Sequence, residues 1–402
     1  MGLHDRVTDW ARDFDHTDEG WAADPYPIWD ELRSTCPVAR SERYGGVWLP
    51  TRHEDVVAIA YDTDHFSSRS VVVSKFRAPV EIAPVGTAPP ISSDPPFHKQ
   101  ARKVLLPVFS PRAVSALEPS TRAYCEELLE QMRGREVVDA AADYAQHIPV
   151  RVIANMLGLP EADADVFRGF VHHVLEGVSL PIEERVAGML PLFDYLEKHI
   201  ADHVGNPRDD LISLLLDSEV DGRKLDGFEV ARMILLLLIA GIDTTWSAIG
   251  ASLWHLARTP ADRRRLLAEP GLMPVAVEEL LRAYAPVTMA RLVKEDMDWN
   301  GCPMKADDWV LLPFPSANRD PAAFAEADTV VIDREVNRHL AFGVGIHRCV
   351  GSHLARMELT VALGAWLAAI PDFELAEPAA VRWSEGQVRG PRILAIRRPA
   401  LP

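Results

Sequence analysis

The sequence of 402 residues contains few cysteines, and they form no metal-binding or disulfide pattern. Cys36, Cys125, Cys302 and Cys349 lie far apart, and no C-x-x-C pair occurs. This spacing suggests neither a zinc site nor a framework of disulfides. We therefore expect a single cysteine with a chemical role.

The sequence also lacks a membrane-length apolar run, a signal sequence and an excess of basic residues. The longest apolar run, 233–242, is about half of the ~20 residues that a membrane span needs, and residues 1–6 contain no apolar stretch of the signal-peptide type. With 42 Lys and Arg against 59 Asp and Glu, the formal net charge of −17 argues against nucleic acid or an anionic membrane as the main partner. We expect a soluble, cytoplasmic protein.

No Gly/Ser linker, low-complexity tract or internal repeat divides the chain, so we expect a single domain over residues 1–402. Helix-period apolar patterns dominate, and the predicted class is mainly α with small β regions (α+β). Helices are predicted over 97–109, 112–133, 140–157, 161–173, 183–204, 226–257, 273–284 and 352–370, and strands near 38, 47–49, 293–299 and 304–312, the last two joined by an Asn300-Gly301 hairpin turn.

Cys349 stands directly before a predicted helix. The stretch 339–351 reads His-Leu-Ala-Phe-Gly-Val-Gly-Ile-His-Arg-Cys-Val-Gly, and a helix-period pattern runs on from Ser352. The free N–H groups and the positive dipole at a helix start stabilise a thiolate, the form of cysteine that ligates iron. Taken alone, Cys349 also fits a buried free cysteine.

The residues around this cysteine suit a flat macrocycle that lies over its sulfur. Gly345 and Gly351 lack Cβ atoms, so the chain can turn sharply before the ligand and pack closely after it. Phe342 would shield the sulfur from water. His347 and Arg348 supply donors for the carboxylates of a haem edge or for a docking partner.

The pattern Phe342-x-x-Gly345-x-x-x-Cys349-x-Gly351 resembles the haem-ligand signature of the cytochrome P450 family. The resemblance extends over essentially the whole chain, with the motifs in family order. It implies the cytochrome P450 fold, in which haem b (iron protoporphyrin IX) lies between a long central helix and the helix after the cysteine loop. Cys349 is then the axial ligand of the haem iron.

The long helix predicted over 226–257 begins with a capping box and is apolar nearly all round before its middle. The polar string Asp243-Thr244-Thr245 stands in that middle. Burying an unpaired polar side chain there costs about 1–3 kcal/mol. Because burial of these side chains does not by itself stabilise the fold, we expect them to have a functional role.

The Thr244 hydroxyl can bond back to the carbonyl of Ala240, and with Gly241 beside it the helix would open into a groove for dioxygen and an ordered water. Asp243 would pass protons inward from solvent, although back-bonded packing is the alternative for the threonine. The string resembles the P450 acid–alcohol pair, with Asp243 and Thr244 at the matching positions. The resemblance implies dioxygen rather than peroxide as the oxidant.

Other residues match the family's haem contacts. His98 and Arg102 are four residues apart on the predicted helix 97–109, so both can bind one anionic group. In the family such a pair reaches a haem propionate. The resemblance adds Arg291 as a propionate donor and His339 as a further candidate.

Glu279 and Arg282 are three residues apart on the predicted helix 273–284 and share one face. An isolated pair of this kind is usually a surface salt bridge. The resemblance instead implies a buried pair that joins Arg334 and holds the cysteine loop in place.

Residues 69–94 form a proline-rich apolar segment that we interpret as a lid over a pocket, and the resemblance makes it the main substrate-contacting loop. Arg69, Lys75 and Arg77 either bind an anionic substrate or are solvated cations, and His172 and His173 either contact substrate or lie on the surface. The substrate-pocket candidates are Val71, Val72, Phe76, Ile91, Ile239, Val287, Met289 and Val388.

The resemblance as a whole implies a soluble haem-thiolate monooxygenase of bacterial type. Such an enzyme inserts one oxygen atom from dioxygen into an apolar small molecule by hydroxylation, epoxidation or dealkylation, and the donating thiolate helps O–O cleavage. A peroxide-driven peroxygenase on the same fold and a non-enzymatic haem sensor are the alternatives. The aliphatic lid favours terpenoid-like or small aromatic substrates.

No reductase sequence follows Pro402, so we expect electrons to come from a separate ferredoxin and ferredoxin reductase, although a piece cut from a longer fusion would look the same. We also expect a monomer. Lys99, Lys103, Arg348 and Arg356 are predicted to form a basic patch on the cysteine side of the haem. A small acidic electron carrier would dock there.

Overall fold

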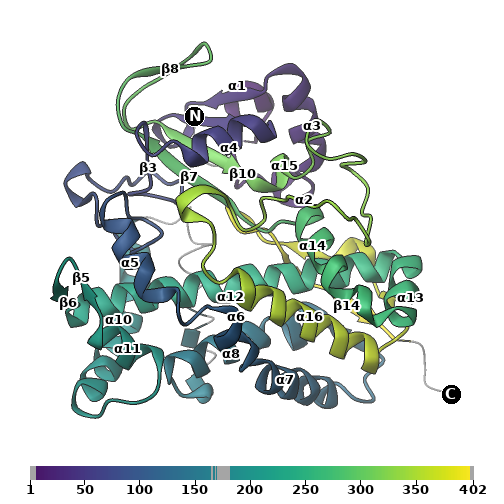
Figure 1. Cartoon of the computed structure of the whole chain (residues 1–402). Helices are drawn as coiled ribbons and strands as arrows, with labels where there is room; N and C mark the ends of the chain where they lie inside the picture. Colours follow the sequence, from purple (N-terminus) through teal and green to yellow (C-terminus); the bar gives the residue numbers. More distant parts are fainter. Residues whose placement is uncertain (1–5, 164–165, 168, 170–181, 399–402) are drawn as a thin grey trace.

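The computed structural model of this chain describes residues 6–163, 166–167, 169 and 182–398. One long helix, α12 (Gly227–Arg258), crosses the molecule; α7, α8, α11 and α16 lie along or beneath it, and α1, α3, α4 and α15 lie above it (Figure 1). Short strands form small sheets beside the helical part. The predicted class, mainly α with small β regions, is confirmed.

The helices predicted over 183–204, 226–257, 273–284 and 352–370 are present with their ends shifted by at most one residue, whereas some other predicted helices are shorter or divided. The predicted helix 97–109 ends at Leu105, because Pro107 cannot continue it. The helices are α1 (Trp10–Asp13), α2 (Glu19–Ala23), α3 (Tyr26–Thr35), α4 (His53–Tyr61), α5 (Phe97–Leu105), α6 (Pro111–Ser115), α7 (Glu118–Gln131), α8 (His147–Leu157), α10 (Ile182–Gly205), α11 (Leu211–Asp217), α13 (Pro260–Ala268), α14 (Met273–Ala283), α15 (Phe314–Ala317), α16 (Ser352–Ala369), the π-helix η3 (Ala140–Ala145), and the 3-10 turns η1 (Arg43–Gly45), η2 (Val80–Ile82), η4 (Glu161–Asp163), η6 (Pro270–Leu272), η7 (Gly345–His347) and η8 (Pro378–Ala380).

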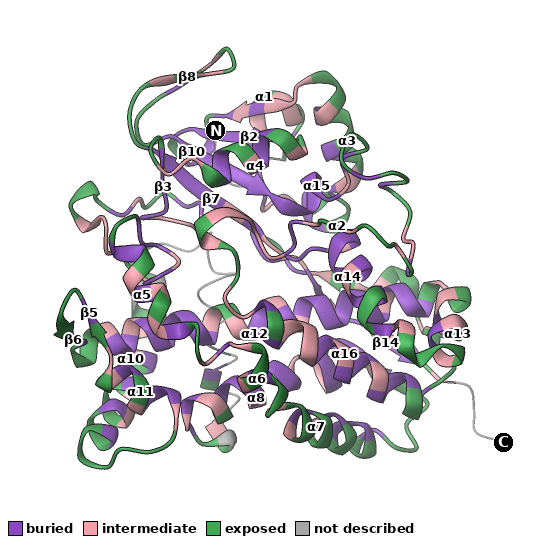
Figure 2. Cartoon of the chain, viewed as in Figure 1, coloured by how far each residue is buried: buried purple, intermediate pink, exposed green. Residues whose placement is uncertain are grey.

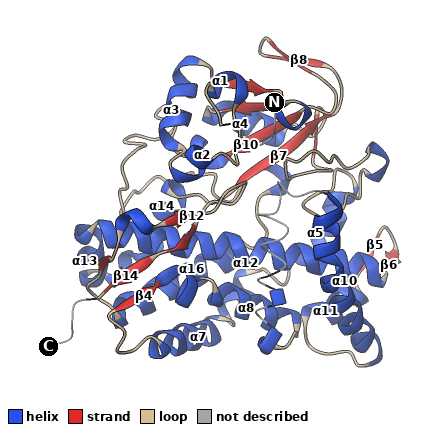
Figure 3. Ribbon diagram, turned by 180° about the vertical axis from the view of Figure 1, so that it is seen from behind, coloured by secondary structure: helices blue, strands red, loops and turns tan. Residues whose placement is uncertain are grey.

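Figure 3 shows β7 and β10 above α12, β4 and β14 below it, and β5 and β6 beside α10. The largest sheet has five strands in the order β1-β2-β10-β7-β3, in which β2 and β10 run parallel and the other neighbours antiparallel. The strands are β1 (Val38–Ser41), β2 (Val47–Pro50), β3 (Phe66–Ser67), β4 (Val137–Asp139), β5 (Glu219–Val220), β6 (Arg223–Lys224), β7 (Thr288–Val293), β8 (Met297–Trp299), β9 (Cys302–Met304), β10 (Trp309–Pro313), β11 (Glu374–Leu375), β12 (Arg382–Trp383), β13 (Pro391–Ile393) and β14 (Ala395–Arg397).

The predicted hairpin turn is confirmed, although the strands around it differ from the prediction. Asn300 and Gly301 have φ values of 53° and 86°, as a tight hairpin turn requires. The expected strands 293–299 and 304–312 are each split, because the chain leaves the large sheet after Val293 and forms the separate hairpin β8–β9, which projects from the body (Figure 1).

The helix α12 forms the centre of the core. Its predicted capping box is present, since Asp226 accepts from the N–H of Glu229 and Glu229 accepts from the N–H of Asp226. The helix is long and apolar enough to cross a membrane, yet 72% of its most apolar window is buried inside the protein (Figure 2). Its apolar character therefore comes from its place in the core.

Candidate active site

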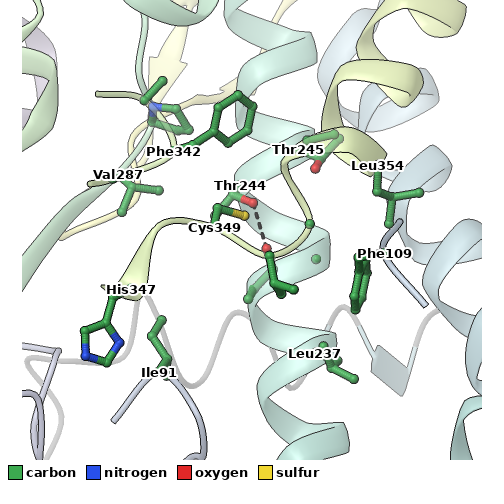
Figure 4. A pocket seen from close by; sticks show the side chains of 18 of the residues that line it. Ile91, Phe109, Leu237, Thr244, Thr245, Val287, Phe342, His347, Cys349 and Leu354 are labelled. Atoms are coloured by element: carbon green, nitrogen blue, oxygen red, sulfur yellow. Dashed lines mark hydrogen bonds between the residues drawn. The ribbon is translucent and has the colours of Figure 1, made fainter. Parts of the chain in front are cut away.

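Cys349 lies directly before α16 and lines a cavity whose opposite wall is α12 (Figure 4). Its N–H donates to the carbonyl of Phe342 at 2.8 Å, which closes the loop around the sulfur. Gly345 has a φ of +74°, and a Cβ atom there would lie 2.8 Å from the carbonyl oxygen of Ala60 in α4. The sharp turn before Cys349 therefore requires glycine.

The groups around the sulfur shift the pKa of the Cys349 thiol in opposite directions. Burial raises the pKa of the Cys349 thiol, whereas the N–H of Gly351 and the charges of Arg102, Arg348 and Arg356 lower it. The predicted lowering of the thiol pKa by N–H groups at the helix start is therefore present, but desolvation raises the pKa by more. A metal ion at the sulfur would displace the proton, because coordinating thiols are deprotonated.

On the opposite wall, Thr244 makes the predicted bond within α12. Its Oγ1 donates to the carbonyl of Ala240 at 2.7 Å (dashed line in Figure 4). The helix continues through this stretch without a break, and the space beside it comes from the small side chains of Ala240 and Gly241. Thr245 lines the same cavity.

Asp243 lies on a different face of α12 and is not among the residues that line the cavity. It is 1% exposed, and its Oδ1 lies 2.7 Å from Nη2 of Arg392 in β13. The Arg392 guanidinium also lies over the ring of Trp246, 4.2 Å from its centroid. The side chain of Arg392 is 15% exposed, so this ion pair extends from the buried helix toward solvent.

One end of the cavity gathers the predicted propionate contacts His98, Arg102, Arg291 and His347. The rings of His98 and His347 have centroids 4.3 Å apart, and Nε2 of His347 lies 3.0 Å from the hydroxyl of Ser68. Burial and neighbouring cations lower the pKa of His98 to about 4 and that of His347 to about 2, so both imidazoles are neutral.

Two buried polar groups at this end lack a full set of partners. Among the residues that the structure describes, Nε2 of His98 has no hydrogen-bond partner. Arg291 is 5% exposed, donates through Nη1 to the carbonyl of Ala290, and burial lowers its pKa to about 10. A buried guanidinium that faces an otherwise apolar cavity needs an anion. A flat apolar macrocycle with carboxylates at one edge therefore fits these residues, with Cys349 below it.

Glu279 and Arg282 form a fully buried pair, which excludes a surface salt bridge. Nε and Nη2 of Arg282 each lie 2.8 Å from the Glu279 carboxylate, and both side chains are 0% exposed. Arg334 donates to the same carboxylate at 3.0 Å, and so does Asn337. Arg282 also donates to the carbonyls of Asn318, Ala327 and Thr329, so the pair fastens the segment that leads to the cysteine loop.

Glu278, beside this pair, binds two residues for which the sequence suggested other contacts. His339 lies 3.1 Å from the Glu278 carboxylate and is not among the cavity-lining residues, so it is not placed as a propionate contact. Arg356 donates to the same carboxylate at 2.6 and 2.7 Å and lies 4.4 Å above the ring of Phe342. Its charge is therefore compensated within the protein.

Three of the eight substrate-pocket candidates line the cavity, namely Ile91, Val287 and Met289. Phe76 is 49% exposed on the outside. The Val71 carbonyl accepts hydrogen bonds from the backbone N–H of Ala290 and from the side-chain amide of Gln387. Val388 forms a backbone β-bridge with Val287. The cavity lining likewise leaves out Val72 and Ile239.

The segment 69–94 is fastened to the body at several points. Arg69 is buried and bonded to Asp307 and to the carbonyl of Ala78, and Arg77 donates to the carbonyls of Asp307 and Gly45. These two arginines are thus structural rather than substrate contacts, and Lys75 is exposed. His172 and His173 lie outside the described residues.

Several cavity residues were not predicted from the sequence. One of them, Phe109, lies in the turn between α5 and α6. The others come from helices whose apolar pattern marks core without marking which face meets a cavity: Ile153, Leu236, Leu237, Phe314, Leu354 and Leu359. Glu358 lines the cavity as well, and an acid within the apolar pattern of α16 is the one signal that could have singled it out.

The comparisons with known proteins agree with this arrangement. Residues 191–375 match the cytochrome P450 family model. The mycinamicin IV hydroxylase/epoxidase of Micromonospora griseorubida is 36% identical over 375 residues, which are 91% of this chain and 94% of the relative. The nocardicin C N-oxygenase of Nocardia uniformis subsp. tsuyamanensis is 36% identical over 376 residues, with the same coverage of 91% and 94%.

A search of solved structures gives the same family. The structure of CYP109E1 from Bacillus megaterium in complex with testosterone superposes with a TM-score of 0.86 at 31% identity, covering 94% of this chain and 98% of the other. Membership of the family implies a haem-thiolate cofactor, a small-molecule substrate and dioxygen. With identities above 30% over nine-tenths of its length, this chain belongs to the cytochrome P450 family and is a P450 monooxygenase.

Proposed function

We propose that this monooxygenase inserts one oxygen atom of dioxygen into an apolar small molecule, with haem b ligated by Cys349. The observation that carries the proposal is a single cavity with the Cys349 sulfur on one wall and the Thr244 hydroxyl on the other (Figure 4). When bound, the haem supplies the reductive activation of dioxygen. Arg291 and Arg102, with the neutral His98 and His347, would hold its carboxylates.

In this proposal Asp243 relays protons toward the cavity and Thr244 orients the water that receives them. Because the Thr244 hydroxyl donates its hydrogen to Ala240, its oxygen is left as an acceptor that orients water in the cavity. Asp243, paired with Arg392, relays protons from the solvent side of α12. A peroxygenase or a haem sensor would have no use for this pair.

The cavity lining supports a proposal for the substrate class. Apart from the propionate end, the threonines and Glu358, the walls are aliphatic or aromatic, with Ile91, Val287 and Met289 among the predicted contacts. Such a surface gains about 25 cal/mol for each Å² of apolar area that a ligand buries. We infer a terpenoid-like or small aromatic substrate, which is oxidised by hydroxylation, epoxidation or dealkylation.

The electron donor is proposed to be a small acidic ferredoxin with its own reductase. Lys99 and Lys103 on α5 and Arg348 beside the cysteine are exposed, and Arg102 links α5 to the cysteine loop by donating to the Arg348 carbonyl. Arg356 is removed from this basic patch because Glu278 neutralises it. The proposal includes one monomeric domain over residues 1–402 that acts in the cytoplasm.

Turnover under two oxidant regimes tests the proposal. The purified protein is screened for ligands by the shift of its Soret band, and each hit is incubated with NADPH, a ferredoxin and its reductase under ¹⁸O₂. We expect a product that carries one ¹⁸O atom. Product formed with hydrogen peroxide but never with the redox chain would identify a peroxygenase, and ligand-induced shifts without any product would identify a sensor.

A further inference from the structure

The side chain of Gln387 joins segments of the chain that are far apart in sequence. It lies in the turn between β12 and β13 and is 5% exposed. Its Nε2 donates to the carbonyls of Thr288 at 2.8 Å and of Val71 at 3.0 Å, and its Oε1 accepts from the N–H of Val73. The amide therefore links the segment 69–94 to the start of β7.

The start of β7, with the residue before it, forms one wall of the cavity. Val287, Met289 and Arg291 line the cavity, and Val287 is seen at this wall in Figure 4. Thr288 and Ala290, which alternate with them, are not among the lining residues, as the two-residue period of a strand requires. The backbone of β7 therefore decides where the side chains of this wall stand.

Gln387 completes the hydrogen bonds of an open strand edge. One side of β7 pairs with β10 over 288–292, whereas β3 pairs with the other side only at 292–293. On that second side, Thr288 bonds to Gln387 through both its N–H and its carbonyl, and Ala290 donates to the Val71 carbonyl. The side-chain amide thus takes the place of the peptide group that a neighbouring strand would supply.

The bonds of Gln387 hold the cavity wall against the segment 69–94. Thr288 and Val73 are buried, so loss of the Gln387 amide would leave a buried carbonyl and a buried N–H without these bonds. Val287 and Met289 are the neighbours of Thr288 in the chain. Their place in the cavity therefore depends on the position in which the amide holds the strand.

We propose that Gln387 is a positioning residue that sets which carbon atom of the substrate is oxidised. Its side chain is not among the described residues that line the cavity, so it acts on the substrate through Val287 and Met289. An apolar substrate makes few hydrogen bonds, so the shape of the cavity walls decides which of its atoms lies near the reacting oxygen. The proposal rests on the monooxygenase function proposed above.

Azole binding to the haem-loaded protein tests this role without turnover. The probes are imidazole and 4-phenylimidazole, whose ring nitrogen ligates haem iron and shifts the Soret band; only the second carries a phenyl ring that must fit between the cavity walls. Gln387→Leu keeps similar volume and removes the side-chain bonds. It should change the Kd of 4-phenylimidazole at least about threefold, since a small misfit in an apolar pocket is worth about tenfold or more, and leave that of imidazole unchanged.

Two further variants separate this role from a general loosening of the turn. Ser384 lies in the same turn, is 4% exposed, donates to the Val388 carbonyl at 2.7 Å and accepts from the N–H of Gly390 at 3.0 Å. Ser384→Ala thus removes two buried bonds that do not reach β7, and both Kd values should match the wild type. Gln387→Glu keeps the acceptor but loses both donors, and should change the Kd of 4-phenylimidazole as Gln387→Leu does.

The outcomes that would overturn the proposal are specific. One is an unchanged Kd of 4-phenylimidazole in both Gln387 variants, and another is an equal change for the two azoles. A change in Ser384→Ala as large as that in Gln387→Leu would also overturn it, because the effect would then come from the turn as a whole. Unfolding in urea shows that each compared variant is folded.

Product analysis tests the selectivity itself, with a substrate found by the Soret screen above and the redox chain under ¹⁸O₂. In Gln387→Leu the ratio of the main product to its positional isomers should change at least about threefold, since a small misplacement of the substrate alters rates by up to about 10²-fold. In a Met289→Ala background the same substitution should have a smaller effect, because Gln387 acts through that wall. An unchanged ratio, or full additivity of the two substitutions, would overturn the proposal. If the wild type makes no product, the proposed function fails, while the azole measurements still decide the role of Gln387.

Discussion

Replacing Arg282 by methionine should destabilise the protein severely, because this residue links α14 to the chain that leads to Cys349. Its guanidinium is 0% exposed, makes two 2.8 Å bonds to Glu279, and donates to the carbonyls of Asn318, Ala327 and Thr329. The Arg282→Met variant fills similar volume but leaves the Glu279 charge and three carbonyls with fewer donors.

The size of the effect follows from the burial of the pair. Removing one partner of a buried ion pair costs on the order of 3–5 kcal/mol, because the other charge stays buried. Arg334 and Asn337 still bond to Glu279, which keeps the loss near the lower figure. Since folded domains are stable by about 5–15 kcal/mol, this one change removes a large part of the total.

The measurement is the free energy of unfolding in urea, followed by circular dichroism. The matched control is Arg122→Met, which breaks the Arg122–Glu118 pair on α7, whose side chains are 46% and 49% exposed. Such an exposed pair contributes about 0.3–0.5 kcal/mol. If Arg282→Met loses no more stability than Arg122→Met, the buried network does not hold the cysteine segment and the reasoning is refuted.

Three further predictions concern the site. Thr244→Ala removes the hydroxyl that orients water, so NADPH consumption should continue while hydrogen peroxide replaces product; unchanged coupling would count against this role. Arg291→Leu removes the buried cation, so haem should transfer to apomyoglobin faster from this variant than from the wild type. An equal transfer rate would show that Arg291 does not hold a propionate. Burial raises the pKa of Glu278, but the bonds and charges of Arg356 and His339 outweigh it and lower the pKa to about 2, from the usual 4.5. The charged form therefore stabilises the fold above pH 4.5, and this contribution is lost as the pH falls toward 2. The stability deficit of Glu278→Gln in urea should be largest at neutral pH and shrink below pH 4.5; a pH-independent deficit would contradict the assignment.

The local features of the chain are predictable because their causes lie within a few residues. The capping box of α12, the Asn300-Gly301 turn and the bond from Thr244 to Ala240 each depend on neighbouring positions, and all three are present. The glycine at position 345, in the loop before Cys349, likewise follows from the tight turn that this loop must make.

The contacts that the sequence could not indicate join distant segments. Arg69 pairs with Asp307, 238 positions away, so a loop that looked like a free lid is fastened to the body. Arg356 pairs with Glu278 across 78 positions, which removes one predicted docking cation. Periodicity tells which face of a helix is buried, but the partner on that face depends on how the helices pack, and Glu358 faces a cavity rather than the core for the same reason.

The most direct test of the central claim is the absorption spectrum of the purified protein after reduction by dithionite and exposure to carbon monoxide. With the Cys349 sulfur on the haem iron, the Soret band should move to the long wavelength that is typical of thiolate-ligated haem, and Cys349→Ser should lack this band while keeping its fold by circular dichroism. A wild-type spectrum without that red-shifted band, or an unchanged band in Cys349→Ser, would contradict the account.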